Sequence, residues 1–280
     1  MREVEAERIA QAVAELCVRV NYRLGEDVLR ALKDALGREH SELGRWALEQ
    51  VLDNARIARE GKFPLCQDTG VAVVFVRMGQ EVRIVGGSLE EAIQEGVRRG
   101  YREGYLRKSV VRDPLRRKNT GDNTPAVVHY RVVPGEELEI ALMAKGAGSE
   151  NMSGLAMLTP ADGRNGVRRF VVEQVRRAGG KPCPPVIVGV GIGGNFELCA
   201  LLAKEALLRP VGERNPDPFY ARMEEELLSE INSLGIGPQG FGGRVTALDV
   251  HVEAAPCHIA SLPVAVNIQC HSARHAKIKI

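Results

Sequence analysis

Apolar residues recur at spacings of three and four over residues 3–36, with a break near 21–25, and the pattern returns over 43–59. Such a period is typical of amphipathic helices, so we predict two helices in the first stretch and a third in the second. Cys17 falls on the apolar face of the first helix and is interpreted as a packing residue. The chain is therefore expected to begin with a helical region.

From Gly70 the pattern changes to short runs rich in β-branched residues. VAVVFVRMG and EVRIVGG are interpreted as one pair of strands. Ser88 and Glu91 have the spacing of a capping box and predict a helix to about residue 103. A second hairpin is expected from AVVHYRVV and ELEIALMAKG, which flank the turn residues Pro134 and Gly135.

Two helix starts stand out in the second half, because Thr159 and Asp217 each precede a proline. A third helix, NFELCALLAKEALL, follows the buried strand PVIVGVG, and TALDVHV and PVAVNIQ add two strands before a basic tail with exposed histidines. The fold class expected is mixed α/β, a helical N-terminal region followed by a mixed sheet with flanking helices. With 280 residues, the chain is long enough for a single large domain, 1–280, or two closely packed ones.

Charge and hydropathy exclude several classes of protein. The formal net charge of +2 gives no reason to expect a nucleic-acid partner. The longest purely apolar stretch, Val71 to Val76, is far too short to cross a membrane. The N-terminus is charged where a signal peptide would be apolar, so a cytoplasmic location is expected.

Six cysteines are spread along the chain rather than gathered as a disulfide framework. Three of them, Cys66, Cys183 and Cys270, stand in or beside segments rich in Gly, Pro or polar residues. Three such thiolates could hold three corners of a [4Fe-4S] cluster and leave the fourth iron open to substrate. Their spacing has no local signature, and loop thiols without a metal, or a Cys nucleophile with a distant His, remain alternatives.

Glycine is concentrated in short segments, and GVGIGG at 189–194 matches the G-x-G-x-x-G pattern between a predicted strand and helix. This leaves a dinucleotide-binding module as a second, different function. The acidic residue expected about 20 positions later is replaced by the proline-rich stretch RPVGERNPDP.

Several longer segments carry a family resemblance: PLCQDTG, NTGDNTPAVVHY, KGAGSEN, PCPPVIVGVGIGG and SLPVAVNIQCHSARH. Together they make the chain resemble the alpha subunit of the class I, iron-sulfur fumarate hydratases. This family also includes the alpha subunit of L(+)-tartrate dehydratase. The segments occur in the family's order over nearly the whole chain.

The resemblance implies roles for particular residues. Cys66, Cys183 and Cys270 would hold the [4Fe-4S] cluster. Asp68 would be the acid-base residue. The implied substrate contacts are Gln67, Arg107, Gly146, Ala147, Gly148 and His258.

The reaction implied is the reversible hydration of fumarate to (S)-malate, with one open iron as Lewis acid. L(+)-tartrate dehydration to oxaloacetate is the alternative. Single-chain members of the family carry a further domain that this sequence lacks. A separate beta subunit is therefore implied, in a heterodimer or an α2β2 assembly that acts on a small dicarboxylate.

Overall fold

The computed structural model describes residues 1–280, which divide into two compact units that alternate along the chain. Unit 1 comprises residues 1–25, 55–147 and 274–280. Unit 2 comprises residues 26–54 and 148–273. Each unit has its own sheet and its own apolar core. The expected mixed α/β class is confirmed.

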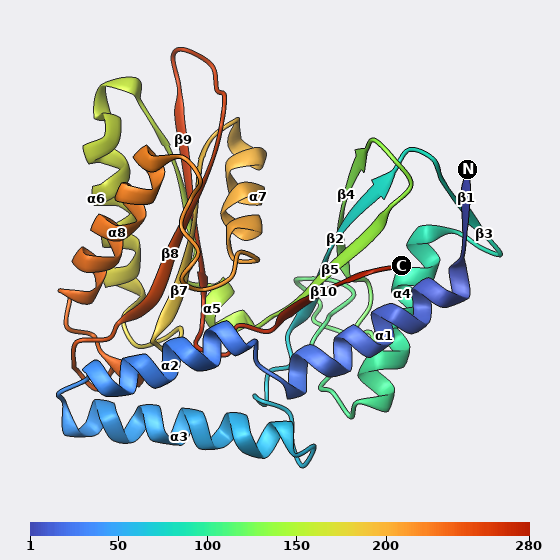
Figure 1. Ribbon diagram of the computed structural model, residues 1–280, viewed down its shortest axis with the longest axis horizontal. Helices are drawn as coiled ribbons and strands as arrows, with labels where there is room; N and C mark the ends of the chain where they lie inside the picture. Colours follow the sequence, from blue (N-terminus) through green and yellow to red (C-terminus); the bar gives the residue numbers. More distant parts are fainter. The chain divides into compact units, whose positions relative to one another are not determined.

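Unit 1 is a four-stranded sheet packed against helices. Its strand order is β10-β5-β2-β4, and a separate parallel pair joins β1 to β3. Two helices, α1 and α4, pack against each other, and α1 also contacts β5 and β10 (Figure 1). The elements are β1 (Arg2–Glu5), α1 (Ala6–Tyr22), β2 (Val71–Gly79), β3 (Val82–Val85), α4 (Leu89–Glu103), β4 (Val127–Val133), β5 (Leu138–Lys145) and β10 (His275–Lys279).

Unit 2 is a sheet with helices on both faces, in strand order β6-β9-β7-β8. Helices α6 and α8 cover one face and α7 the other (Figure 1). Its elements are α2 (Glu26–Arg38), α5 (Ala147–Glu150), β6 (Gly154–Leu158), the 3-10 turn η1 (Pro160–Asp162), α6 (Gly163–Ala178), β7 (Val186–Gly193), α7 (Phe196–Ala206), α8 (Pro218–Asn232), η2 (Pro238–Gly240), β8 (Ala247–Ala255) and β9 (Leu262–Gln269), while α3 (Glu42–Arg59) begins in unit 2 and ends in unit 1.

The predicted helix boundaries are confirmed at their caps. Ser88 Oγ accepts a hydrogen bond from Glu91 N, and Asp217 caps α8 at Phe219 N. Thr159 forms its capping box with Asp162 in η1, so α6 itself begins at Gly163. None of the helices combines the length and the apolar character that crossing a membrane requires.

The predicted strand pairings of unit 1 are wrong. β2 does not pair with β3, which pairs with β1 instead. The strands of the expected second hairpin, β4 and β5, are separated by β2, which pairs in parallel with β4 and antiparallel with β5. The physical reason is burial: Ala72 to Val76 are all buried, so β2 needs a neighbour on each edge.

The C-terminal segment is not an exposed tail. Residues 275–279 form β10, which pairs antiparallel with β5. Ile280 is buried, and its carbonyl accepts a hydrogen bond of 2.5 Å from Arg2 Nη2. His271 and His275 are both half-buried.

Candidate active site

The loop that carries Asp68 is fixed from several directions within unit 1. Its carboxylate Oδ1 accepts from Gly70 N at 3.0 Å, and Oδ2 accepts from Ala147 N at 2.8 Å. The buried hydroxyl of Tyr101 donates to the carbonyls of Thr69 and Gly70 at 2.8 and 3.0 Å. Burial raises the pKa of Tyr101, so this hydroxyl stays protonated and remains a donor.

Two glycines let backbone approach this loop. Gly70 has φ +76°, and a Cβ there would come within 2.8 Å of the Lys145 backbone. Gly146 faces Asp68, because a Cβ would lie 3.4 Å from Asp68 Oδ2 and 3.2 Å from Arg274 Nη2. The segment Gly146–Ala147 therefore lies against the Asp68 carboxylate.

Arg274 is a residue that the sequence analysis missed. It is 1% exposed, and its Nη1 donates to Asp68 O at 2.7 Å and to Asn21 Oδ1 at 3.0 Å. Its Nε is buried without a hydrogen-bond partner. A buried guanidinium is costly unless its donors are used, so it orders the loop around Asp68. The only signal was its place four residues after Cys270.

Arg107 joins this group through its backbone. Thr69 Oγ1 donates to Arg107 O at 3.0 Å, while the Arg107 side chain is exposed. Gln67 is exposed, and its Oε1 lies 3.5 Å from Cys66 Sγ. Unit 1 therefore brings together six of the predicted residues, listed here in chain order: Cys66, Gln67, Asp68, Arg107, Gly146 and Ala147.

In unit 2, Cys183 and Cys270 lie on adjoining loops at one end of the sheet. His271 donates its backbone N–H to Cys183 O at 3.4 Å, and its Nδ1 lies 3.0 Å from the same oxygen. Cys183 itself has φ +57°, a left-handed conformation that these contacts help to hold. Gly148 belongs to the same region, since a Cβ there would be 3.8 Å from Lys181 O.

His258 lies at the other end of the same sheet. It is in the β8–β9 turn, so the whole of β9 separates it from Cys270. Eight residues at a rise of about 3.3 Å put the two ends about 26 Å apart. Unit 2 therefore does not bring His258 to Cys183 and Cys270, and its expected substrate contact stays a prediction.

The six cysteines differ in their surroundings, and none forms a disulfide. Cys17 and Cys199 are buried on helices, and burial raises the pKa of both thiols, which leaves them inert. Cys66 and Cys270 are half-buried in loops, and Cys183 is exposed. Solvent-accessible loop thiols suit thiolate ligation, so the donor set fits an iron-sulfur group. Within neither unit do three His, Cys, Asp or Glu side chains form a metal site.

GVGIGG has a structural role. Gly189 and Gly191 lie inside β7, which is paired on both edges, with β8 and with β9. A Cβ on either glycine would come within 2.0 Å of a carbonyl of α7. The glycines let α7 pack closely on the sheet, and their N–H groups sit in ladders rather than in a phosphate-binding loop. The dinucleotide alternative has no support here.

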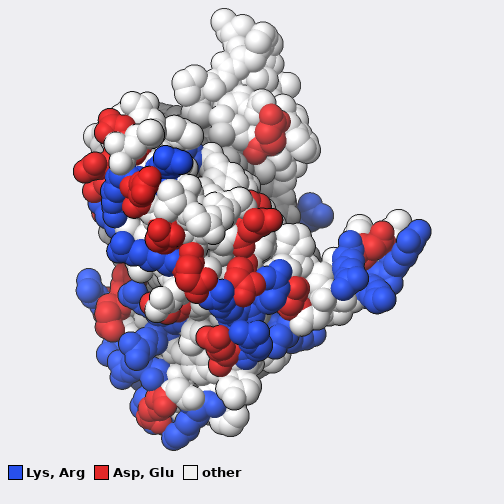
Figure 2. All heavy atoms as spheres, turned by 90° about the vertical axis from the view of Figure 1, so that its right-hand side faces the viewer, with Lys and Arg blue, Asp and Glu red and all other residues white.

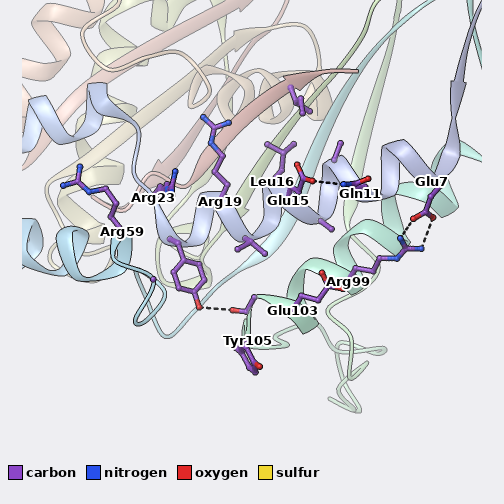
Figure 3. A pocket seen from close by; sticks show the side chains of 17 residues that line it. Glu7, Gln11, Glu15, Leu16, Arg19, Arg23, Arg59, Arg99, Glu103 and Tyr105 are labelled. Atoms are coloured by element: carbon purple, nitrogen blue, oxygen red, sulfur yellow. Dashed lines mark hydrogen bonds and ion pairs between the residues drawn. The ribbon is translucent and has the colours of Figure 1, made fainter.

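A cavity of about 900 Å³ in unit 1 contains none of the predicted site residues. It lies along α1 and α4 and is spanned by the Glu7–Arg99 ion pair and the Tyr22–Gly104 hydrogen bond (Figure 3). Gln11 also donates to Glu15 across one turn of α1. The candidate site is therefore built from loops and not from this cavity.

Comparisons with known proteins agree with the motif pattern. Residues 10–279 match the family described as fumarate hydratase (Fumerase). The chain belongs to the fumarate hydratase family. It is an enzyme of the hydro-lyase class, and its Asp68 loop and three loop cysteines lie within the matched region.

The curated relatives of this family member are named as alpha subunits. A Methanocaldococcus jannaschii protein, provisionally named L(+)-tartrate dehydratase subunit alpha, is 46% identical over 275 residues, which is 96% of each chain. The L(+)-tartrate dehydratase subunit alpha of Escherichia coli strain UTI89 is 33% identical over 276 residues, or 98% of this chain and 91% of the relative. The K12 strain protein of the same name is 32% identical over the same length.

Proposed function

We propose that this chain is the cluster-binding alpha subunit of an iron-sulfur hydro-lyase that interconverts fumarate and (S)-malate. The observation that carries the proposal is the family match over residues 10–279. The relatives' names, subunit alpha, support a beta subunit as partner, in a heterodimer or an α2β2 assembly. The thiols, none of them in a disulfide, favour a reducing compartment, the cytoplasm.

Cys66, Cys183 and Cys270 would hold the [4Fe-4S] cluster. When bound, an open iron would supply Lewis-acid chemistry that polarises a hydroxyl or carboxylate oxygen. The protein's own residues would orient the substrate and move a proton. Arg107 has an exposed guanidinium, a fork suited to gripping one substrate carboxylate in two places.

Asp68 is the proposed acid-base residue. Its two oxygens each accept a backbone hydrogen bond, which fixes the carboxylate in one orientation beside Gly146 and Ala147. A fixed carboxylate can take or return a carbon-bound proton without reorganising during the reaction. Gln67 and the Gly146–Gly148 backbone are proposed to contact the substrate around it.

A second candidate, L(+)-tartrate dehydration, is favoured by the names of the curated relatives. Malate and L-tartrate differ by one hydroxyl, and the contacts that distinguish them would lie in part on the proposed beta subunit. Turnover of malate, fumarate and L-tartrate by the assembled pair, measured under anaerobic conditions, separates the two. The substrate with the higher kcat/KM identifies the reaction, and no turnover of any of them would contradict both candidates.

Cluster ligation has its own test in iron and sulfide content with an electron paramagnetic resonance spectrum. We expect about four irons per chain. Cys66→Ser, Cys183→Ser and Cys270→Ser should each lose most of this iron. Cys257→Ser is the matched control, because Cys257 is an exposed loop thiol in unit 2 at the end opposite Cys183. Equal iron in all four variants would refute the ligand assignment.

A further inference from the structure

Residues 107–119, termed the basic arm, form an ordered projection from unit 1 directly after α4 and the turn that follows it. Val111 bridges Asn119 in antiparallel fashion, and Arg112 N donates to Lys118 O at 2.8 Å. At the turn, Asp113 Oδ1 accepts from Leu115 N at 2.9 Å and from Arg116 N at 2.6 Å. The arm thus holds its shape through its own hydrogen bonds.

The basic arm concentrates positive charge. It contains one acidic residue, Asp113, against six basic ones, and six less one gives a formal charge of +5 on a chain whose total is +2. Figure 2 shows Lys and Arg gathered on this projection at its right-hand side. No ion pair within the chain neutralises any of the six, which are Arg107, Lys108, Arg112, Arg116, Arg117 and Lys118.

An apolar side chain stands at the tip among these charges. Leu115 is 90% exposed, and burying such a side chain is worth about 1.5–3 kcal/mol. A binding site for a small anion would not require an exposed apolar side chain. Arginines around a leucine suit a protein surface with an apolar centre and an acidic rim. Nucleic acid would use the charges and leave Leu115 in water.

The base of the arm is bonded to the candidate active site. Ser109 N donates to Asn123 Oδ1 at 2.6 Å, and Asn123 Nδ2 donates to Gly70 O at 3.2 Å. Thr69 Oγ1 donates to Arg107 O. A partner that fixes the arm would therefore also fix the backbone of Arg107 and of the Asp68 loop.

We propose that the basic arm is a docking element that inserts Leu115 into an acidic-rimmed apolar recess on the beta subunit. The inference rests on the proposed function in one respect only, because it requires that a beta subunit exists. Within the interface, Leu115 supplies buried area, while Arg116, Arg117 and Lys118 supply electrostatic attraction and hence a dependence of affinity on salt.

The test is the dissociation constant of the full-length alpha chain for the beta subunit, measured by anaerobic titration at two salt concentrations. Leu115→Ser should weaken binding about tenfold or more at both. A triple variant, Arg116→Ser/Arg117→Ser/Lys118→Ser, should weaken binding at low salt and reduce the dependence of affinity on salt. The control is Arg30→Ser/Lys33→Ser with Leu43→Ser, exposed residues of α2 and α3, which should bind as wild type.

Thermal unfolding and iron content of each variant accompany the titration. Wild-type affinity in both arm variants, or no binding of the wild-type chain to the beta subunit, overturns the proposal. Weakened binding with an unchanged melting temperature supports it. An assembled wild-type pair that holds no iron and turns over none of the three diacids would refute the proposed function while leaving the docking result intact.

Discussion

The carboxylate of Asp68 serves two purposes, since the group proposed to move a proton also accepts hydrogen bonds from Gly70 and Ala147. Asp68→Asn removes the carboxylate and replaces one acceptor oxygen with an amide donor. We expect turnover to fall about 100-fold to 10,000-fold, because general acid–base groups contribute on that scale. Iron content should be unchanged in the anaerobic preparation.

Thr69→Val is the matched control for Asp68→Asn. It removes the hydrogen bond to Arg107 O from the same loop and keeps the carboxylate. Turnover of this variant should stay within about tenfold of wild type. If both variants lost activity equally, the loop geometry and not the Asp68 carboxylate would be the essential feature.

Glu39 is a buried carboxylate that holds two segments of unit 2 together. It is 2% exposed and accepts backbone hydrogen bonds from His40, Ser41, Arg244 and Val245 at 2.8–3.0 Å. Glu39→Gln offers one acceptor oxygen in place of two. The free energy of unfolding should fall by roughly 2–3 kcal/mol in denaturant titrations, whereas the exposed Glu42→Gln should change it by less than about 0.5 kcal/mol.

Glu39 also makes the free energy of unfolding depend on pH in a defined direction. Burial alone would raise the pKa of Glu39, but the four backbone N–H groups outweigh it and lower the pKa below 4.5. A lowered folded-state pKa stabilises the fold above pH 4.5, and this contribution is lost as the pH falls through the folded value. The stability difference between wild type and Glu39→Gln should therefore shrink between pH 6 and pH 3. A constant difference would contradict this assignment.

Among the elements, the helices could be predicted from sequence and the strand partners could not. Helix caps such as Ser88 are local, so their signals survive in the sequence. The order of the strands depends on how much of each strand is buried on the two faces of the sheet. The uninterrupted apolar run of β2 marks a central strand, while β4, none of whose residues is fully buried, lies at the sheet edge. Proximity in sequence favoured hairpins that burial does not allow.

Some residues of the candidate site could likewise be predicted from the sequence, and others could not. The segments carrying Cys66, Asp68 and Gly146 are recognisable because their motifs are contiguous. Arg274 was missed because its burial depends on β10 pairing with the distant strand β5. His258 stands near Cys270 in sequence, yet β9 carries the chain to the other end of the sheet between them.

The contact between β7 and α7 makes a prediction at the level of whole elements. A Cβ on Gly191 would lie 2.0 Å from Cys199 O and 2.6 Å from Ala203 N, both helix backbone atoms that cannot move alone. Gly191→Ala should displace α7 and lower the free energy of unfolding by about 1–3 kcal/mol, as overpacking does. Denaturant titration of the purified chain measures the loss.

Gly37→Ala is the control for this substitution. Gly37 lies in α2, and nothing lies within 4 Å of a Cβ built on it. Alanine there should leave stability unchanged or raise it by up to about 1 kcal/mol. Equal losses from Gly191→Ala and Gly37→Ala would mean that the close helix–sheet approach is not what requires glycine at 191.

For the whole molecule, the decisive feature is that neither unit is one continuous segment. The chain leaves and re-enters unit 1, and the last seven residues, 274–280, return to it from unit 2. They supply β10, the buried Ile280 and Arg274, which bonds Asn21 and Asp68. We therefore expect the order of unit 1 to depend on residues 274–280.

A chain ending at Ala273 should accordingly lose order in unit 1 in particular. β5 would become an edge strand, and the β5 amides that now face β10 should exchange with solvent at least tenfold faster. Removing residues 1–5 is the matched deletion. It takes β1 from its pair with β3, together with the Arg2 hydrogen bonds to Glu136 O and Ile280 O, and leaves the β2–β4–β5 ladders and the β5–β10 pairing in place. Hydrogen exchange followed by mass spectrometry distinguishes the effects of the two deletions. Because Arg274 also orders the Asp68 loop, the amides of residues 69–70 should exchange faster in the shorter chain as well. Unchanged exchange in both β5 and residues 69–70 would show that unit 1 is held together without its last strand.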